Sequence, residues 1–405
     1  MDTNNKQIIG LFGFGVVGEG LYHVLQHSHT TNAKIRKICI KDPDKPRSVS
    51  PACFTTVPED ILDDERINLV VELINDAEAA YYIVKQALIR GKSVVSGNKQ
   101  MLAFHLGELL DLQKQTGAAL LYDASACGSI PAIRNLEEYY DNDLLLSITG
   151  ILNGSSNYVL SKVFRNGLDY QAALQQARDQ GFLEADPGLD VGGFDALYKL
   201  VILSLHGFGT LVKPGEVFVS GIEKLGQADI NYAREKGYRI KLVAQAAKMD
   251  NDAFNCLVLP KMVSREDPIY YVENEYNGVV INGAFYEQQF MFGKGAGGLP
   301  TGSSVLSDIT ARMHDYRYEY KKRKYYSPPR HTNDVKLKVY LRCRKKNDLQ
   351  AFSMDQVTES LSTAHHHHMI GFIRLNKLLE LKDHLNAMDG FLAFFYAEPD
   401  THEHS

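Results

Sequence analysis

The chain lacks most of the features that mark secreted, zinc-bound or membrane-inserted proteins. Its five cysteines are odd in number, scattered over 405 residues and without any CxxC spacing. This pattern is typical of reduced thiols in a cytoplasmic protein and argues against a disulfide framework or a zinc site. The most apolar internal stretch, LVILSL at 200–205, is far shorter than the roughly 20 residues of a membrane span.

A strong excess of charge of one sign is also missing. The 44 basic and 49 acidic side chains give a formal net charge of −5, which argues against nucleic acid or an anionic membrane as the main partner. The opening stretch MDTNNKQIIGLFGFG has no cationic leader before an apolar segment, so we expect no secretory signal. What remains is ordinary globular composition, 44% hydrophobic and 23% charged, at a length that predicts two to three domains.

Strands and helices alternate in the first third of the chain. Apolar strands are predicted at 8–13, 34–40, 67–74, 93–98 and 118–125, with helices following 15, at 77–91 and at 105–117. This alternation predicts a parallel, doubly wound (Rossmann-type) sheet with both faces covered.

The pattern changes after residue 140. Strand-like stretches (LLLSITGILNG, NCLVLPKMVS), a hairpin at 277–293 and intervening helices predict a second, α+β domain. The Tyr- and Lys-rich stretch 316–330 ends in two prolines and indicates a boundary. Beyond it, strands at VKLKVYLRCR and GFLAFFYAE with a helix near QVTESLS predict a small βα module. We therefore expect a dinucleotide-binding domain at 1–135, a substrate and dimerisation domain at 136–300, a helix and linker at 301–325 that pack back on the first domain, and an ACT-like module at 331–400.

A glycine motif lies where the first strand meets the first helix. In Gly13-Phe14-Gly15-Val16-Val17-Gly18, the first glycine allows the tight turn, the second lets backbone approach a pyrophosphate, and the third lets helix and strand pack closely. The helix N-terminus then offers N–H groups and a positive dipole to phosphates. A βα turn with convenient glycines is the alternative.

Two lysines are candidates for the cofactor edge of this sheet. Lys41 ends the second strand, with Asp42, Lys45 and Arg47 nearby, and a cation there favours the 2′-phosphate of NADP over the 2′-hydroxyl of NAD. Solvated surface charge is the alternative. Lys99 follows the strand SVVSGN, at the carboxyl edge where ligands of such sheets bind.

The stretch GFLEADPGLDVGGFDALYK at 181–199 concentrates acids on a bend before a helix. Asp195 and Lys199 are four residues apart, acid first, which favours a side-chain pair on a helix. Apolar neighbours predict that Lys199 is partly buried, and a buried lysine needs a partner. A paired lysine beside a carbonyl can donate a proton as charge develops on oxygen, and Glu184 and Asp190 can bind a substrate ammonium or hydroxyl. A helix-start acid cluster that merely complements the dipole is the alternative.

These motifs together resemble the homoserine dehydrogenase family. The signature ARDQGFLEADPGLDVGGFDALYK is joined, in order along 7–312, by GFGVVG, SGNK, YDASACGSIP, ILNGSSNYVL, VSGIEKLGQADINYAREKGYRIKL and GKGAGGLPTGSSVLSDI. The resemblance implies reversible NAD(P)H-dependent reduction of aspartate 4-semialdehyde to homoserine, towards threonine, methionine and isoleucine. NADP is the preferred expectation, with NAD left open. A homodimer or homotetramer is implied as well.

The resemblance also implies roles for single residues. Lys199 matches the proton donor, Asp195 its catalytic partner, and Lys99 the lysine that contacts nicotinamide and substrate. Glu184 matches the residue for the substrate amino end, with Asp190 nearby. Asn75 and Gly295 match cofactor contacts. Implied ligands of a structural monovalent cation, expected to be sodium, are Asp123, Ala126, Gly128 and Ile130.

The sequence departs from the family at three places. Asp123 stands where glutamate is usual, Asn75-Asp76 replaces glycines, and the C-terminal module lacks a glycine-marked ligand turn, so feedback by threonine is left open. A reductase of another amino-acid-derived carbonyl and a non-catalytic dinucleotide sensor remain alternatives.

Three further features receive plainer interpretations. His365–His368 are interpreted as a solvated or interface loop rather than a metal site, and Cys127 as a packing residue rather than an acylating thiol. The basic run 316–326 is interpreted as a connecting helix rather than an RNA site.

Overall fold

The fold is taken from a computed structural model that describes residues 6–29, 32–47, 49–183, 186–249 and 252–398. Contacts divide the chain into two compact units. Unit 1 comprises residues 1–141 and 294–324, and unit 2 comprises residues 142–293 and 325–405. The C-terminal segment belongs to unit 2 rather than forming a third unit, and the stretch around 301–324 belongs to unit 1.

Unit 1 contains the predicted parallel sheet. All of its strand pairs are parallel. From one edge to the other the strands are β3 (Phe54–Thr55), β2 (Ala33–Cys39), β1 (Gln7–Phe12), β4 (Leu69–Glu72), β5 (Ser93–Ser96) and β6 (Leu120–Leu121). The order 3-2-1-4-5-6 is that of dinucleotide-binding Rossmann folds, whose ligands bind outside the carboxyl ends of β1 and β4.

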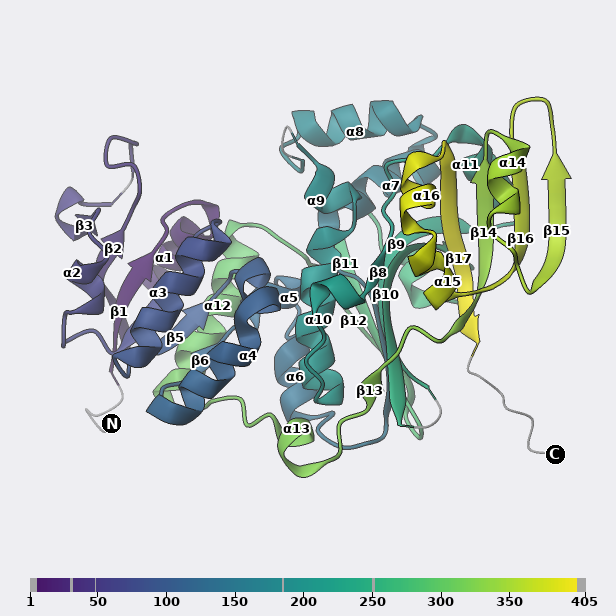
Figure 1. Ribbon diagram of the computed structural model, residues 1–405. Helices are drawn as coiled ribbons and strands as arrows, with labels where there is room; N and C mark the ends of the chain where they lie inside the picture. Colours follow the sequence, from purple (N-terminus) through teal and green to yellow (C-terminus); the bar gives the residue numbers. More distant parts are fainter. Residues whose placement is uncertain (1–5, 30–31, 48, 184–185, 250–251, 399–405) are drawn as a thin grey trace. The chain divides into compact units, whose positions relative to one another are not determined.

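Helices pack on this sheet in pairs (Figure 1). Helix α1 contacts α12, and α3 contacts α4. The helices of the unit are α1 (Val16–His27), α2 (Glu59–Leu62), α3 (Ala77–Ile89), α4 (Lys99–Thr116), α5 (Ala124–Cys127), α6 (Ala132–Glu138) and α12 (Gly298–Met313), with α13 (Lys321–Tyr325) at its end and a 3-10 turn at Pro51–Cys53. Because α12 comes late in the chain yet packs on α1, the chain returns to the cofactor unit after building the second unit.

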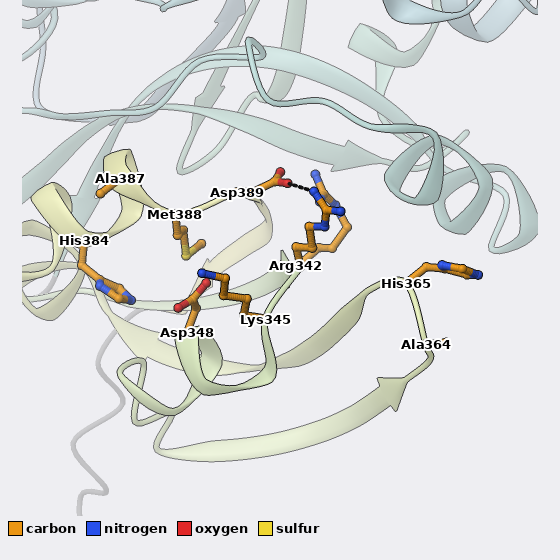
Figure 2. Close-up of a pocket in the computed structure, with 10 residues that line it drawn as sticks. Arg342, Lys345, Asp348, Ala364, His365, His384, Ala387, Met388 and Asp389 are labelled. Atoms are coloured by element: carbon orange, nitrogen blue, oxygen red, sulfur yellow. Dashed lines mark ion pairs between the residues drawn. The ribbon is translucent and has the colours of Figure 1, made fainter.

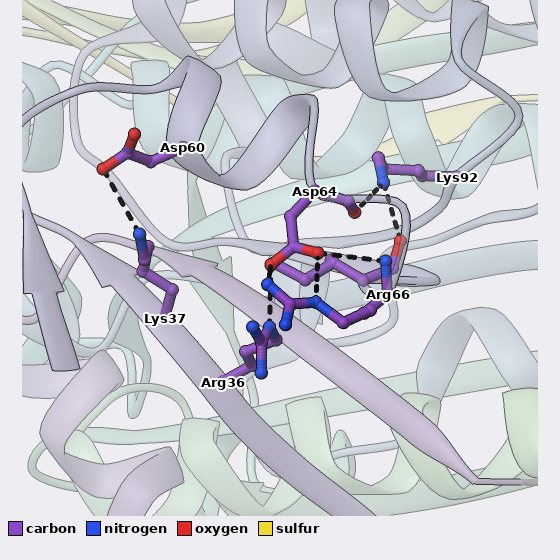
Figure 3. Close-up of polar contacts among 7 residues, drawn as sticks. Arg36, Lys37, Asp60, Asp64, Arg66 and Lys92 are labelled. Carbon is purple, nitrogen blue, oxygen red and sulfur yellow. Dashed lines mark hydrogen bonds and ion pairs between the residues drawn. The ribbon is translucent and has the colours of Figure 1, made fainter.

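A charged cluster stabilises the amino-terminal edge of this sheet (Figure 3). Asp64 accepts from Arg36 Nε at 2.7 Å and from Arg66 Nε at 2.9 Å, and these guanidinium bonds hold the pKa of the Asp64 carboxyl well below its usual range. Lys92, just before β5, donates to the carbonyls of Asp64 and Ile67, both at 2.7 Å. The cluster lies where β4 and β5 begin, opposite the ligand edge, so we interpret it as structural.

Unit 2 is built on one mixed sheet that continues into the C-terminal segment. Its strand order is β12, β11, β7, β9, β10, β17, β14, β16, β15, with β8 and β13 pairing β10. The strands are β7 (Leu145–Ile151), β8 (Phe218–Val219), β9 (Arg239–Met249), β10 (Ala253–Val263), β11 (Tyr276–Gly283), β12 (Glu287–Lys294), β13 (Arg330–His331), β14 (Lys336–Cys343), β15 (Gln356–Ser362), β16 (His367–Arg374) and β17 (Gly390–Glu398).

Helix α10 (Phe194–Phe208) is buried on every side against β7, β9 and β10. All its residues from Asp195 to Phe208 are buried, so it is a core helix rather than an amphipathic one. Gly193 (φ +86°) begins it and Gly209 (φ +77°) ends it in the left-handed region. The other helices before β9 are α7 (Gly154–Asn166), α8 (Tyr170–Asp179), α9 (Gly188–Val191) and α11 (Gln227–Glu235), with 3-10 turns at Pro214–Glu216 and Pro268–Tyr271.

The C-terminal module has βαββαβ topology. Strands β14, β15, β16 and β17 alternate with α14 (Lys346–Gln350) and the pair α15 (Leu375–Glu380) and α16 (Lys382–Ala387), in the spatial order β17, β14, β16, β15. This is a ferredoxin-like arrangement. Its apolar core is continuous with Phe218, Leu257 and Leu259 of β8 and β10. The ACT-like assignment remains a prediction.

Two sequence-based expectations about single elements need correction. The stretch QVTESLS, predicted to lie near a helix, is strand β15, paired antiparallel to β16 alone. Val357 and Leu361 are four residues apart, a spacing that suits one face of a strand as well as a helix. The strand predicted at 118–125 covers only Leu120–Leu121, because the chain turns into α5 at Ala124. Within the described residues, no helix is long and apolar enough to cross a membrane.

Candidate active site

The glycine turn after β1 has the geometry expected of a pyrophosphate-binding loop. Gly13 has φ +92°, a value that side chains disfavour. A Cβ on Gly18 would lie 2.3 Å from the Gly13 carbonyl oxygen, so only glycine allows this approach of helix to turn. A Cβ on Gly15 would meet nothing within 4 Å, which leaves open space beside the backbone at the start of α1. The residues therefore fit a dinucleotide.

The loop after β2 brings cations towards this turn. Lys41 is exposed two residues beyond β2, and Arg47 lies 5.4 Å over the Phe54 ring. Phe54 in turn packs edge-on against Phe14 of the glycine motif, with ring centroids 5.5 Å apart. The nearby carboxylate of Asp42 accepts the backbone N–H of Asp44 within its own loop. Arg47 is thus connected to the glycine turn through two aromatic rings.

A buried glutamate organises the loop that begins α4. Glu72, fully buried at the carboxyl end of β4, accepts from Ser96 Oγ at 2.5 Å and from the Ile74 N–H at 2.7 Å. Asn98 donates to the Ile74 carbonyl and caps α4 by accepting from the Met101 N–H. Lys99 is the first residue of α4, directly after this network. Burial raises the pKa of Glu72 to about 7.

The predicted acid–lysine pair is present in unit 2. Lys199 Nζ lies 2.7 Å from Asp195 Oδ2, and both residues are 7% exposed. Lys199 Nζ also donates to the Leu152 carbonyl at 2.7 Å. An ammonium carries three N–H donors, and the described residues accept from two of them. The third is available to a ligand oxygen.

Asn153 connects Asp195 to a second carboxylate of this site, Asp190. Its Nδ2 donates to Asp190 Oδ1 at 2.7 Å and to Asp195 Oδ2 at 2.9 Å, while its Oδ1 caps α7 by accepting from the Ser156 N–H. Asp190 and Asp195 are thereby held on one amide. Asp186 is exposed in a turn with Gly188, and Glu184 lies outside the described residues.

Comparison with known proteins places this geometry in a family. The family model described as the NAD binding domain of homoserine dehydrogenase matches residues 13–123, and the homoserine dehydrogenase model matches residues 131–310. The homoserine dehydrogenase of Bacillus subtilis is 33% identical over 359 residues, 85% of this chain and 83% of the relative. That of Synechocystis sp. is 37% identical over 311 residues, 74% and 72% of the two chains.

The chain belongs to the homoserine dehydrogenase family. Similar solved structures are homoserine dehydrogenases as well. A homoserine dehydrogenase from Thiobacillus denitrificans matches with a TM-score of 0.84 and 26% identity over 96% of this chain and 98% of its own. A hyperthermophilic archaeal homoserine dehydrogenase, solved in complex with NADPH, matches with a TM-score of 0.66 and 25% identity over 77% and 99%. The chain is therefore an oxidoreductase, and the two alternatives, a different reductase and a non-catalytic sensor, are not favoured.

The remaining predicted cofactor contacts of this homoserine dehydrogenase lie in unit 1. Val16 and Val17 open α1. Asn75 is exposed between β4 and α3, where Asp76 caps α3. The Gly295 carbonyl packs against Gly128, since a Cβ there would approach it to 2.4 Å.

One of the predicted cation ligands, Asp123, belongs to a buried pair of carboxylates with Asp308. Asp123 Oδ1 accepts the Arg134 N–H, and the Asp123 N–H donates to Asp308 Oδ2. Arg134 Nη2 pairs with Asp308 at 2.6 Å. Burial and the Asp123 charge raise the pKa of Asp308 to about 7. The Arg134 guanidinium pairs with Asp308, and Asp123 is a second buried carboxylate beside this ion pair. A cation held by Asp123 and by the carbonyls of Ala126, Gly128 and Ile130 therefore fits the local charge and an oxygen-only donor set.

The histidine run lies in the C-terminal module, away from these residues in sequence. His365 is one of the residues that line an open cavity of about 890 Å³, together with Arg342, Lys345 and His384. Figure 2 shows the His365 ring apart from the side chains of Lys345 and His384. His368 is buried against Tyr232 and Tyr340. Among the described residues no group of three or more His, Cys, Asp or Glu could hold a metal ion. Cys127 is fully buried, in keeping with packing.

Sequence reasoning missed Glu72, Asn153 and the Leu152 carbonyl. Asn153 stands in ILNGSSNYVL, a stretch used only for the resemblance, and its N-cap position before a helix was a signal. Glu72 ends an apolar strand at the carboxyl edge of the sheet, where a charged residue is unusual. The Leu152 carbonyl could not be predicted from the sequence, because every residue has a backbone carbonyl and the residue type does not indicate which of them accepts a bond.

The raised pKa of Glu72 predicts a pH-dependent stability. Between the ordinary value of 4.5 and about 7 the folded protein retains a proton that the unfolded chain has lost. The free energy of unfolding therefore falls as pH rises through this window, and the loss persists above it. Glu72→Gln removes the loss, so its Tm should exceed that of the wild type by several degrees near pH 8, and the difference should vanish near pH 5.

The control for this measurement is Glu65→Gln, which changes an exposed acid of the same unit. Its effect on Tm should be the same at both pH values. Thermal melts by circular dichroism suffice, and a Glu72→Gln shift that does not depend on pH would contradict the assigned protonation.

Proposed function

We propose that this chain catalyses the reversible NAD(P)H-dependent reduction of L-aspartate 4-semialdehyde to L-homoserine, with Lys199 as the proton donor. The observation that carries the proposal is the buried Lys199–Asp195 pair with one N–H left for a ligand. When bound, NAD(P)H supplies the hydride for the aldehyde carbon. The relatives named above support this substrate, since each is a homoserine dehydrogenase.

Lys199 donates to the aldehyde oxygen as negative charge develops there. Asp195, one helical turn earlier, fixes the ammonium and neutralises its charge in the buried helix. Without this carboxylate the buried ammonium would lose its counter-charge, and an uncompensated buried charge is costly. In the oxidative direction the same amine receives the proton of the homoserine hydroxyl.

The acids of the 181–199 stretch bind the amino end of the substrate. Asp190, oriented by Asn153, and Glu184 are assigned to the substrate ammonium. An ammonium is matched by carboxylates held at fixed positions, because little side-chain entropy is then lost on binding. Lys99, placed at the start of α4 by the Glu72–Ser96–Asn98 network, is assigned to the nicotinamide end of the cofactor and to the substrate.

NADP is the assigned cofactor. Cations follow β2, and the Arg47 guanidinium packs on Phe54 next to the glycine turn. A cation in this loop favours a 2′-phosphate. The archaeal relative solved with NADPH is consistent with this choice. Gly13, Gly15 and Gly18 are assigned to the pyrophosphate.

Two further assignments complete the proposal. Sodium is assigned to Asp123 and the carbonyls of Ala126, Gly128 and Ile130. A homodimer is assigned to unit 2, where the edge strand β12 exposes Phe290 (42%) and Phe292 (52%). Apolar side chains exposed together on one strand favour a protein partner.

Replacing Lys199 tests the proton donor. Lys199→Met should lower kcat for aspartate semialdehyde by about two to four orders of magnitude, while the Kd for NADPH changes by less than about threefold. Steady-state kinetics and a fluorescence titration of NADPH measure the two quantities. The control is Lys248→Met, which removes a β9 lysine that donates to the Asp143 carbonyl, and its kcat should equal that of the wild type. Equal loss of turnover and cofactor binding in a folded Lys199→Met protein would refute the role.

The cofactor assignment predicts a selective effect of Arg47. Wild-type kcat/KM should be higher with NADPH than with NADH. Arg47→Ala should lower kcat/KM with NADPH at least about tenfold, because one charge-assisted contact is lost. The kcat/KM with NADH should stay within about threefold of the wild-type value. Lys37→Ala, which removes a cation of β2 paired with Asp60, is the matched control. Equal losses with both cofactors would argue against recognition of the 2′-phosphate.

The cation assignment predicts a specific salt effect. At constant ionic strength, replacing choline chloride with sodium chloride should raise the wild-type Tm by a few degrees, because an ion bound only by the folded state stabilises it. Asp123→Asn should abolish the response, whereas Asp111→Asn, an exposed acid of α4, should keep it. A wild type indifferent to the exchange would remove the cation from the proposal.

A further inference from the structure

The Leu152 carbonyl that receives Lys199 has a second donor. Asn277 of β11 donates its Nδ2 to the same oxygen at 3.1 Å. Leu152 follows β7 and Lys199 is on α10, so three separate elements meet at one backbone oxygen. A carbonyl oxygen has two lone pairs, and both are used here.

The orientation of the Asn277 amide follows from its partner. Because Leu152 offers an acceptor, the amide end that faces it must be the NH₂ group, which leaves Oδ1 on the other side. Asn277 is 0% exposed, and its Oδ1 has no hydrogen-bond partner among the described residues. The amide therefore satisfies one polar atom and leaves another buried and unsatisfied.

Stability alone does not account for an amide at this position. The penalty for a buried, unsatisfied oxygen is at least as large as the net gain from one neutral hydrogen bond. Leucine has a similar shape and no polar atom to satisfy. The Leu152 carbonyl would still have Lys199 as a donor. The amide of Asn277 therefore brings little or no net gain to the free energy of folding.

We propose that Asn277 is a positioning residue for Lys199. A lysine ammonium lies at the end of four flexible methylene groups, so its direction depends on the acceptors that hold it. Asp195 and the Leu152 carbonyl are those acceptors, both at 2.7 Å. With two N–H bonds fixed, tetrahedral geometry determines the direction of the third. Asn277 holds the carbonyl from the β11 side and so fixes where the third N–H points.

This inference rests on the proposed role of Lys199 and adds a residue to it. A misdirected N–H weakens a hydrogen bond that strengthens only as charge develops on the aldehyde oxygen. The loss should therefore appear in kcat and leave ground-state binding almost unchanged. A residue with a purely structural role would not separate these two parameters.

The test compares two asparagines of the same strand. Asn277→Leu removes the donor at Leu152 and keeps the shape. Asn282→Leu is the matched control, since Asn282 also donates from β11 to a residue of β7, Ser147 Oγ at 2.8 Å, about 17 Å further along the strand. The full chain is used, with aspartate semialdehyde and NADPH, and folding is checked by thermal melts.

For Asn277→Leu we expect kcat to fall at least about tenfold, with both KM values within about twofold of the wild type. For Asn282→Leu we expect kcat within about twofold. The proposal would be overturned if the kcat of Asn277→Leu equalled that of the wild type. It would also be overturned if Asn277→Leu and Asn282→Leu lost kcat to the same extent. If Asn277→Leu does not fold, Asn277→Ala replaces it, because the smaller side chain also removes the donor and introduces no steric clash. Wild-type kcat in that variant would equally overturn it.

The wild-type assay separates the two proposals. A wild type that does not reduce aspartate semialdehyde refutes the proposed function. A wild type that does, together with an unimpaired Asn277→Leu, refutes only the positioning role.

Discussion

A charged amine in the middle of an apolar helix is the constraint on which unit 2 depends. Helix α10 is buried from Asp195 to Phe208, so Lys199, which is 7% exposed, has little bulk water to solvate it. Its charge is tolerated only because Asp195 and the Leu152 carbonyl replace that water. These acceptors must in turn be held, and Asn153 and Asn277 hold them. The arrangement of α7, α9, β7 and β11 around α10 can be understood as the support of this one ammonium.

Unit 1 solves the opposite problem, since it must bind a negative ligand at a surface. The glycine turn offers backbone N–H groups at the start of α1, with open space where Gly15 lacks a side chain. The fully buried Glu72 lies one strand away and bonds Ser96 and the Ile74 N–H rather than facing a cation. The two units thus use buried acids differently: Asp195 pairs with a lysine, whereas Glu72 bonds a hydroxyl and a backbone N–H.

Features that depend on neighbours in sequence were predictable from the sequence. The glycine turn depends on six consecutive residues, and the Asp195–Lys199 pair on one helical turn, so both have a local signature. Asn153 is 37 and 42 residues from the two carboxylates it joins, and Asn277 is 125 residues from Leu152. No spacing rule connects such positions, because the fold alone brings them together. The same limit explains QVTESLS, where pairing with β16 decided between two periods that the residues allow equally.

The continuity of the C-terminal module with the sheet of unit 2 has a consequence for shortened forms of the chain. Strand β10 is bordered by β17, and Phe218, Leu257 and Leu259 are buried in the core that the module completes. A chain that ended before β14 would expose these three side chains and the edge of β10 at Lys261, the position that pairs with β17, and an exposed apolar surface of this kind is prone to aggregation. Deleting the module alone would therefore leave an apolar surface on unit 2. A shortened chain would first need polar replacements along β8 and β10, so the solubility of unit 2 depends on its C-terminal segment.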